Sequence, residues 1–346
     1  MNRTALLALG GLTWAGARAL RSRRAVSFRD RVVVISGGSR GLGLVLARQL
    51  ADEGARLALL ARTAEDLETA ADELEARTGR RPFVAACDVR ERGAVEAAVA
   101  GAAEALGAPS VLIHDAGVIE VGPREHMDEA DYREALGVHF WGAYYLTEAV
   151  LPHLPRDGSG RIGYVSSVAG LVSAPHLAPY SAGKHALVGY ADAVRAELAA
   201  EGIRVTTIAP GLMRTGSPPN AVVKGDHERE YAWFTIADAN PLVSMDADRA
   251  AAKIVDALRH GDPALTLTLP AKLGAALDGV APGLVGRVAA FANGLLPDAV
   301  GAEGDRRQSG WDSFSDAAPS PLTAPSDRET VENNELRGRS PDALED

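Results

Sequence analysis

Residues 31–43 read RVVVISGGSRGLG and join a β-branched run to a glycine-rich turn. The run Arg31–Ser36 predicts a buried strand, and the apolar spacing over Leu42–Asp52 predicts a helix directly after the glycines. Glycines at such a turn let the backbone approach a pyrophosphate, while the helix N-terminus offers free N–H groups and partial positive charge. The stretch therefore predicts a dinucleotide-binding loop between the first strand and the first helix of the fold.

The same alternation of strands and helices continues to about Leu269. Further strands are expected at Arg56–Ala61, Pro82–Cys87, Ser110–His114, Arg161–Val165, Ile203–Ala209 and Ala264–Leu269. Helices are expected at Ala64–Thr78, Glu91–Leu106, Asp128–Leu151, Pro179–Glu201 and Asp246–His260. This pattern predicts a single α/β domain, a doubly wound parallel sheet (Rossmann fold) with flanking tails. Ligands bind such sheets outside the carboxyl ends of the strands, so functional residues should follow the strand ends.

The composition limits which domain organisation and which binding partners are possible. The 346 residues carry a formal net charge of -10, which argues against nucleic acid, and the single cysteine, Cys87, excludes an intramolecular disulfide. We expect an apolar and basic N-terminal segment (1–28), a catalytic domain (29–270), an apolar helical extension (271–300) and a disordered acidic tail (301–346). The tail is rich in Ser, Pro, Asp and Glu and has no apolar period. No metal site is expected.

The N-terminal segment has three interpretations. Ala5–Ala17 is apolar apart from Thr13, and arginines follow it between Arg18 and Arg24. The run is shorter than the roughly 20 residues that a membrane span needs. It could be a leader resembling a signal peptide, a marginal anchor whose arginines hold the chain in the cytoplasm, or an added helix. Export would remove the chain from its reduced cytosolic cofactor, so we expect a cytoplasmic protein, attached to the cytoplasmic face of a membrane if the segment is an anchor.

The end of the second strand indicates which dinucleotide binds. It reads Leu60-Ala61-Arg62-Thr63, without the Asp or Glu that usually holds the ribose 2′-hydroxyl of NAD. Arg62, together with Arg40 in the glycine loop, could instead hold a 2′-phosphate, since guanidinium groups bind phosphate bidentately. The alternative is two solvated surface arginines; we favour NADP(H).

Tyr180 and Lys184 follow the fifth strand and lie four residues apart, on one face of a predicted helix. A nearby ammonium favours the phenolate, lowers the pKa of the tyrosine and lets it exchange a proton. Such a pair arises by chance in some sequences, so its position after a strand end matters. Ser167, at that strand end, could hydrogen-bond the substrate oxygen. Ser166 is its rival, and a serine that only caps a turn is the alternative.

These pieces together resemble the short-chain dehydrogenase/reductase family from about Arg31 to Leu269. The matching elements are SGGSRGLG (36–43), CDV (87–89), HDAG (114–117), VSS (165–167), YSAGK (180–184) and PGLMRT (210–215). The resemblance implies that Ser167 polarises a carbonyl, that Tyr180 is the general acid or base, and that Lys184 binds the nicotinamide ribose. It also implies a homodimer or homotetramer.

The resemblance also implies a set of cofactor contacts. Asp88 and Val89 would border the adenine, and Gly211 and Thr215 would hold the nicotinamide amide. The arginines resemble those of NADP(H)-preferring members. The full expected set is Gly37, Ser39, Arg40, Gly41, Leu42, Gly43, Arg62, Asp88, Val89, Ala116, Gly117, Tyr180, Lys184, Pro210, Gly211 and Thr215.

Two positions depart from the family pattern. His114-Asp115 stands where the family has two mainly structural asparagines. His139 stands where the family has an asparagine that holds a proton-relay water. Imidazole can also relay protons, which predicts a pH dependence near neutrality. A packing histidine with no catalytic part is the equal alternative.

The segment Leu212–Asn240 should cover the substrate, and its residues Met213, Tyr231, Trp233 and Phe234 suggest a lipophilic one. These side chains could equally pack on the domain itself.

Residues 270–297 are apolar and could extend the pocket, form a subunit interface or lie on a membrane surface. The leading hypothesis is an NADPH-dependent oxidoreductase acting on a carbonyl or secondary alcohol. One alternative is a 3-oxoacyl thioester reductase, which would need a basic patch for its acidic carrier. The other is a dinucleotide-binding scaffold or sensor without turnover.

Overall fold

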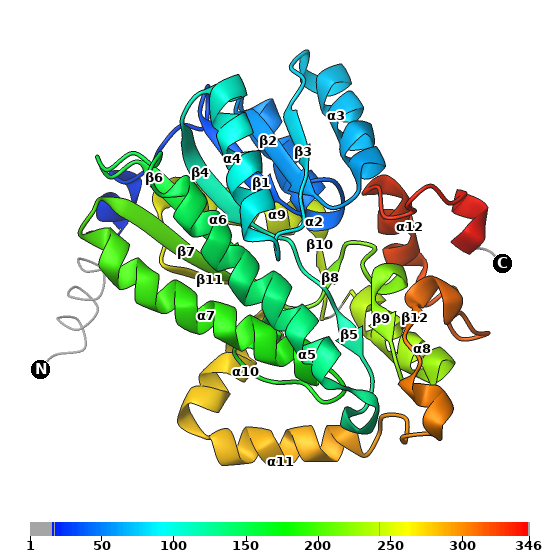
Figure 1. Cartoon of the computed structure of the whole chain (residues 1–346). Coiled ribbons are helices and arrows are strands. Elements are labelled where there is room, and N and C mark those ends of the chain that lie inside the picture. The colour runs from blue at the N-terminus through cyan, green and yellow to red at the C-terminus, as the bar shows by residue number, and fades with distance from the viewer. Residues whose placement is uncertain (1–15, 17, 242, 345–346) are drawn as a thin grey trace, which may run out of the picture.

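A parallel sheet forms the centre of the computed structural model, which describes residues 16, 18–241 and 243–344 (Figure 1). Its seven strands have the order β11-β7-β6-β4-β1-β2-β3. They are β1 (Val32–Ser36), β2 (Arg56–Ala61), β3 (Phe83–Ala86), β4 (Pro109–His114), β6 (Gly160–Val165), β7 (Ile203–Ala209) and β11 (Ala264–Thr266). The chain reverses direction across the sheet between β1 and β4, which is the predicted doubly wound arrangement. The predicted fold class is confirmed.

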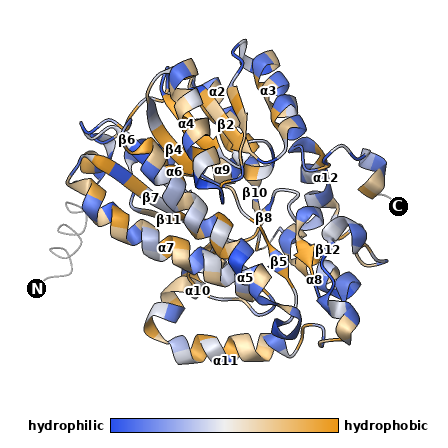
Figure 2. Ribbon diagram, in the orientation of Figure 1, coloured by the Kyte–Doolittle hydropathy of each residue, from blue (hydrophilic) through white to orange (hydrophobic). Residues whose placement is uncertain are grey.

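Helices cover both faces of the sheet, which explains why β1, β4 and β6 are buried along their whole length. One layer holds α2 (Gly41–Asp52), α3 (Ala64–Thr78) and α9 (Ala247–His260); the other holds α4 (Arg92–Leu106), α6 (Gly142–Val150) and α7 (Ala178–Ala199). Alternate residues of β1 serve the two cores. Val33 and Ile35 pack with α2 and α9, whereas Val34 packs with α4, α6 and α7. Figure 2 shows this apolar interior between the layers.

The helix expected over Asp128–Leu151 is interrupted. It consists of α5 (Glu129–Leu136), a wider π-helical turn over Gly137–Trp141, and α6. A π turn inserts an extra residue into a helix and is frequent at functional sites. Here the wider turn carries His139, which is fully buried.

The expectation of a disordered C-terminal tail is wrong for the described residues 301–344. Strand β12 (Gln308–Ser309) pairs with β9 (Val222–Val223), which also pairs with β5 (Glu120–Val121) in a small second sheet. Helix α12 (Ala324–Glu332) packs on α8 (His227–Ala239).

The charges of the tail explain why composition misleads here. Arg307 donates hydrogen bonds to Asp131 at 3.0 Å and to Glu134 at 2.5 Å, both in α5. Ser326 of α12 donates to Asp238 of α8 at 2.9 Å. Polar residues that look suited to solvent therefore find fixed partners on the domain, and their hydrogen bonds offset part of the cost of ordering the tail.

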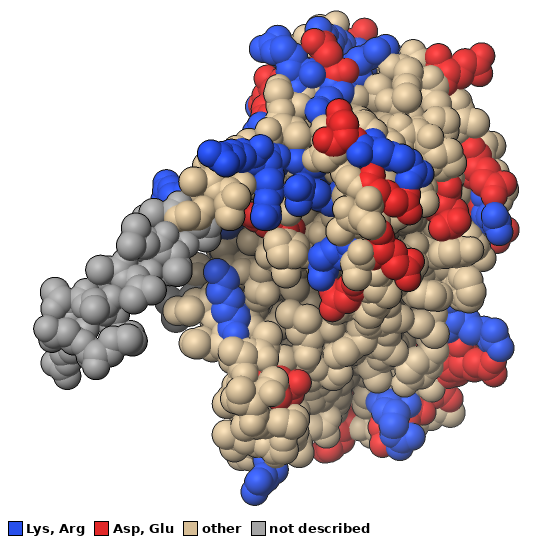
Figure 3. Space-filling model, turned by 90° about the vertical axis from the view of Figure 1, so that its left-hand side faces the viewer, with Lys and Arg blue, Asp and Glu red and all other residues tan. Residues whose placement is uncertain are grey.

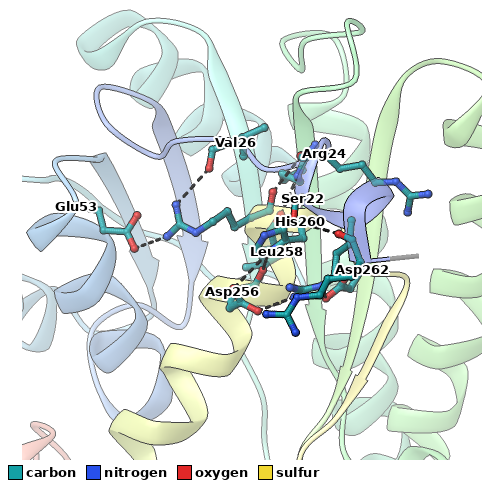
Figure 4. Close-up of polar contacts among 12 residues, drawn as sticks. Ser22, Arg24, Val26, Glu53, Asp256, Leu258, His260 and Asp262 are labelled. Carbon is teal, nitrogen blue, oxygen red and sulfur yellow. Dashed lines mark hydrogen bonds and ion pairs between the residues drawn. The ribbon is translucent and has the colours of Figure 1, made fainter. Parts of the chain in front are cut away.

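The chain before β1 docks on the end of α9 (Figure 4). Arg21 forms ion pairs with Asp256 at 2.6 Å and Asp262 at 2.7 Å. The buried Arg161 donates to the carbonyl oxygen of Arg24 at 2.7 Å. Most of the predicted anchor, Ala5–Ala17, lies outside the described residues. Among the residues that are described, no helix is both long and apolar enough to cross a membrane.

Residues 269–293 form the expected helical extension, as the hairpin of α10 (Leu269–Val280) and α11 (Pro282–Asn293). Its large apolar side chains are exposed, with Val280 82% and Phe291 72% accessible. Figure 3 shows that surface without Lys, Arg, Asp or Glu extends between scattered charged side chains over the lower half of the molecule. The hairpin thus leaves an apolar surface uncovered.

Candidate active site

A cavity of about 850 Å³ lies at the carboxyl ends of the central strands. Its lining includes the residues that follow β1, β2, β4, β6 and β7, where ligands bind in doubly wound sheets. The structure brings every expected site residue to this cavity except Gly43 and His139. The strand-end prediction therefore gathers one continuous site from seven separate segments of sequence.

The glycine loop forms a cradle that side chains would fill. Gly37 has a φ of +79°, and a Cβ there would lie 2.8 Å from the amide nitrogen of Ala116. A Cβ on Gly43 would lie 2.1 Å from the carbonyl oxygen of Gly37, so Gly43 packs beneath the loop instead of lining the cavity. Only glycine permits these close approaches of the backbone. The N-terminus of α2 lies beside the two glycines. The cradle therefore fits the pyrophosphate of a dinucleotide.

The two predicted arginines line one end of the cavity. Arg62 is exposed, whereas the Nη1 atom of Arg40 is buried and finds no hydrogen-bond acceptor among the described residues. The carboxylate of Glu335 lies 3.6 Å from that atom. Arg40 therefore retains donor capacity for an anionic group, as a 2′-phosphate would require.

The side chain of Ser167 lies beside Tyr180 and acts to lower the pKa of the phenol. Ser167 also accepts a bond from the amide of Ala169 at 3.1 Å, which fixes its side chain at the end of β6. Ser166 is buried, and its hydroxyl donates to the carbonyl oxygen of Lys184 at 3.1 Å. Ser167 therefore occupies the predicted place beside the tyrosine, whereas Ser166 fastens α7 to β6.

Lys184 lies under the tyrosine ring. Its Nζ atom is 5.6 Å from the ring centroid of Tyr180 and donates to the carbonyl oxygen of Val165 at 2.9 Å. We expected Lys184 to lower the pKa of the tyrosine, but burial raises the pKa of Tyr180 to about 12, and the side chain of Ser167 opposes this only in part. Desolvation dominates because the phenolate would lose its water.

His139 makes the contacts of a packing residue. Its Nε2 atom accepts the amide of Val118 at 3.2 Å, and its ring meets Tyr180 edge-on with centroids 5.4 Å apart. Burial, and next the charge of Lys184, lower the pKa of His139 well below its usual range. Both effects disfavour the charged imidazole, and the Nδ1 atom is buried without a hydrogen-bond partner among the described residues.

The other departure places two polar side chains at the end of β4. His114 Nδ1 lies 2.8 Å from the hydroxyl of Ser36 and ties β4 to β1. Burial raises the pKa of the Asp115 carboxyl, and the positive charge of Lys184 acts in the opposite direction. Asp115 thus sets a carboxyl group near the lysine where the family pattern has a neutral amide.

The substrate end of the cavity is apolar. Met213, Trp233 and Phe234 line it as predicted, joined by Leu296 from the segment after α11. Tyr231 does not: it is fully buried, and its ring packs on Phe314 with centroids 5.3 Å apart. The segment Leu212–Asn240 therefore divides its aromatic residues between the cavity and the domain core.

The sequence interpretation missed the part of the cavity that the tail builds. Arg307, Gln308, Ser309, Glu335 and Arg337 all line it. Their signal was weak, because an acidic and proline-containing composition is typical of disorder and no apolar period marks the contact.

Comparisons with known proteins cover most of this architecture. The sequence model of the family described as short chain dehydrogenase matches residues 31–222. Dehydrogenase/reductase SDR family member 7B of Danio rerio is 34% identical over 243 residues, 69% of this chain and 77% of that protein. A putative ketoacyl reductase of Streptomyces coelicolor is 34% identical over 188 residues, 54% of this chain and 72% of that protein. The structure of levodione reductase matches with a TM-score of 0.60 and 26% identity, over 69% of this chain and 96% of that one.

Proposed function

Because the chain belongs to the short-chain dehydrogenase/reductase family of oxidoreductases acting on alcohol and carbonyl groups, we propose that it is an NADPH-dependent reductase of lipophilic ketones or aldehydes. One observation carries the proposal. A single cavity is lined by the arginines Arg40 and Arg62, by Tyr180, and by apolar side chains that include Phe234.

The residues divide the chemistry between them. When bound, NADPH supplies the hydride. The Ser167 hydroxyl would hold the carbonyl oxygen, and Tyr180 would donate its proton to that oxygen as negative charge develops there. Burial keeps Tyr180 protonated at neutral pH, because its pKa is raised to about 12, and this suits a proton donor. The ammonium of Lys184 would stabilise the phenolate that remains.

The proposal is tested with purified protein, NADPH and a panel of carbonyl compounds graded in apolar surface. We expect NADPH oxidation that rises in kcat/KM with the apolar surface of the substrate, since the lining has few polar groups. Absence of turnover across the panel, with NADPH still bound, would favour the scaffold or sensor alternative.

Arg62 provides a test of the cofactor form. Arg62→Ala removes a guanidinium group from the proposed phosphate end, and a charge-assisted hydrogen bond contributes about 1.5–3 kcal/mol. We therefore expect NADPH to bind roughly tenfold or more weakly, with NADH unaffected. Fluorescence titration of both cofactors measures this. Equal affinity of the wild-type protein for NADPH and NADH would contradict the cofactor assignment.

A 3-oxoacyl thioester reductase is the second candidate, supported by the likeness to a putative ketoacyl reductase. Its acidic carrier would need free basic residues at the cavity mouth. Arg307, the arginine at the substrate end, is already ion-paired with Asp131 and Glu134. We therefore rank this candidate below the carbonyl reductase.

We also propose that the α10–α11 hairpin rests on a lipid surface. Its large apolar side chains are exposed, and Ala292 and Leu296, at the end of α11 and just after it, line the cavity. A lipophilic substrate leaving a membrane would therefore meet the cavity beside the hairpin. We expect the full chain to float with phosphatidylcholine vesicles, and the double variant Val280→Ser/Phe291→Ser to lose about tenfold or more of this binding, since each buried apolar side chain contributes about 1.5–3 kcal/mol.

Leu322→Ser provides the matched control for that experiment. Leu322 is 68% exposed but lies in the tail, outside the hairpin. Flotation that survives the double variant would assign membrane binding to the N-terminal segment instead. A wild-type chain that fails to float but dimerises through the hairpin would make a second copy the occupant of this face.

A further inference from the structure

The C-terminal tail reaches back to the glycine loop through residues 333–337, which we call the tail strap. The carbonyl oxygen of Asn333 accepts the amide of Gly41 at 2.8 Å. The side-chain amide of Asn334 donates to the carbonyl oxygen of Ser39 at 3.0 Å. The strap therefore contacts the loop that precedes α2 through directed hydrogen bonds.

Three further contacts fix the strap from other sides. Arg48 of α2 donates to the side chain of Asn333 at 2.8 Å. Asn334 also donates to the carbonyl oxygen of Asp66 at 3.2 Å, at the start of α3. The buried carboxylate of Glu335 accepts from Asn220 at 2.8 Å. The strap is thus held by elements on both sides of the cavity, as a built wall of the site requires.

Arg337, at the end of the strap, lines the same cavity as Arg40 and Arg62. Burial lowers the pKa of Arg337 most, and the positive charges of those two arginines act in the same direction, against the carboxylates of Asp66 and Glu335. Among the described residues, Arg337 has no carboxylate at ion-pairing distance. Glu335 lies 3.6 Å from Arg40, but the three guanidinium groups still repel one another, and an anion bound among them would relieve that repulsion.

The acidic residues at this end do not remove the attraction for an anion. Glu335 and Asp66 line the cavity beside the arginines. Burial raises the pKa of Glu335 to about 7, so this carboxyl is partly protonated near neutral pH. Asp88, which also lines the cavity, is ion-paired with Arg90 at 2.6 Å, so the three guanidinium groups keep their attraction for an anion.

We propose that Arg337 is a third phosphate-binding residue, which joins Arg40 and Arg62 around the phosphate on the adenosine ribose of NADP(H). The tail strap then forms the outer wall of the phosphate end of the cofactor site, built from a part of the chain beyond the matched family region. This inference rests on the proposed NADPH function. It adds a specificity residue that the glycine loop and β2 alone do not supply.

Arg337→Ala tests the assignment. We expect the Kd of NADPH to rise about tenfold, as for loss of a hydrogen bond to a charged group, and the Kd of NADH to stay within twofold. Fluorescence titration of the full chain with each cofactor measures both. Arg339→Ala is the matched control, because Arg339 stands two residues further on and stacks over the Trp311 ring at 4.8 Å. It should leave both affinities unchanged.

The outcomes separate this inference from the proposed function. If the wild-type chain prefers NADPH and Arg62→Ala removes that preference, but Arg337→Ala does not, the third arginine is overturned and the proposed function stands. Equal weakening of NADPH and NADH by Arg337→Ala would make the strap a structural support only. A wild-type chain that binds NADPH and NADH equally well would overturn both the proposed function and this inference. Arg62→Ala would then change the affinity for neither cofactor.

Discussion

Replacing Tyr180 by phenylalanine is expected to lower the rate of NADPH-dependent carbonyl reduction about 10³-fold, within the range found for loss of a general acid. The hydroxyl lies in the cavity that Ser167 also lines, so its loss removes the proton donor and one donor to the developing oxyanion. The phenyl ring remains and keeps its edge contact with His139. NADPH affinity should therefore change by less than about threefold. Single-turnover rates and cofactor titration measure the two effects separately.

Tyr144→Phe is the matched control for this result. It removes the same hydroxyl from α6, at a position outside the cavity lining, and should keep wild-type turnover. If Tyr180→Phe and the wild type reduced a broad carbonyl panel at equal rates, Tyr180 would not be the proton donor.

Gly43→Ala is expected to lose at least about 2 kcal/mol of folding free energy, since overpacking a tight contact typically costs about 1–3 kcal/mol. The added Cβ would lie 2.1 Å from the carbonyl oxygen of Gly37 and 2.9 Å from the Asp115 carboxylate. The carbonyl group of Gly37 belongs to the backbone and cannot move aside as a flexible side chain can, so the whole loop must shift. NADPH affinity should fall about 100-fold, because the shifted glycine loop no longer fits the pyrophosphate of the cofactor.

For Gly93→Ala we expect the opposite result, with no loss of stability. Gly93 lies in α4, and a Cβ there meets nothing within 4 Å. Alanine is favoured over glycine in helices by about 1 kcal/mol, so this variant should be as stable as the wild type or more so. Urea unfolding and NADPH titration compare the pair. Similar stability and affinity for the two variants would show that the cradle tolerates a side chain at Gly43.

The sheet and the centre of the site could be predicted because local patterns determine them. The β-branched run of β1 and the glycines after it lie within one short segment, and the strand-end rule then gathers Arg62, Ser167 and Tyr180. Each inference needed only neighbouring residues and the general geometry of parallel sheets. The protonation states could not be predicted in this way. Burial of Tyr180 and His139 is a property of the assembled core.

The tail could not be predicted for a different reason. Its contacts with the domain are polar and specific, such as Asn334 with Ser39 and Arg307 with Asp131, and neither leaves a periodic pattern in the sequence. Composition measures the capacity to build an apolar core, and this segment needs none of its own. Tyr231 is a second example. The sequence cannot tell whether an aromatic side chain faces a cavity or packs in the core, as Tyr231 does against Phe314.

The hydrogen bond between Asn334 and Ser39 also bears on the biosynthesis of the protein, because it joins residues 295 positions apart. The glycine loop leaves the ribosome early, whereas its partner is translated 295 residues later. Domains begin to fold from the N-terminal side during synthesis. The sheet can therefore assemble while the wall formed by the strap is still missing, and the cavity would gain this wall only after residues 333–337 have been synthesised.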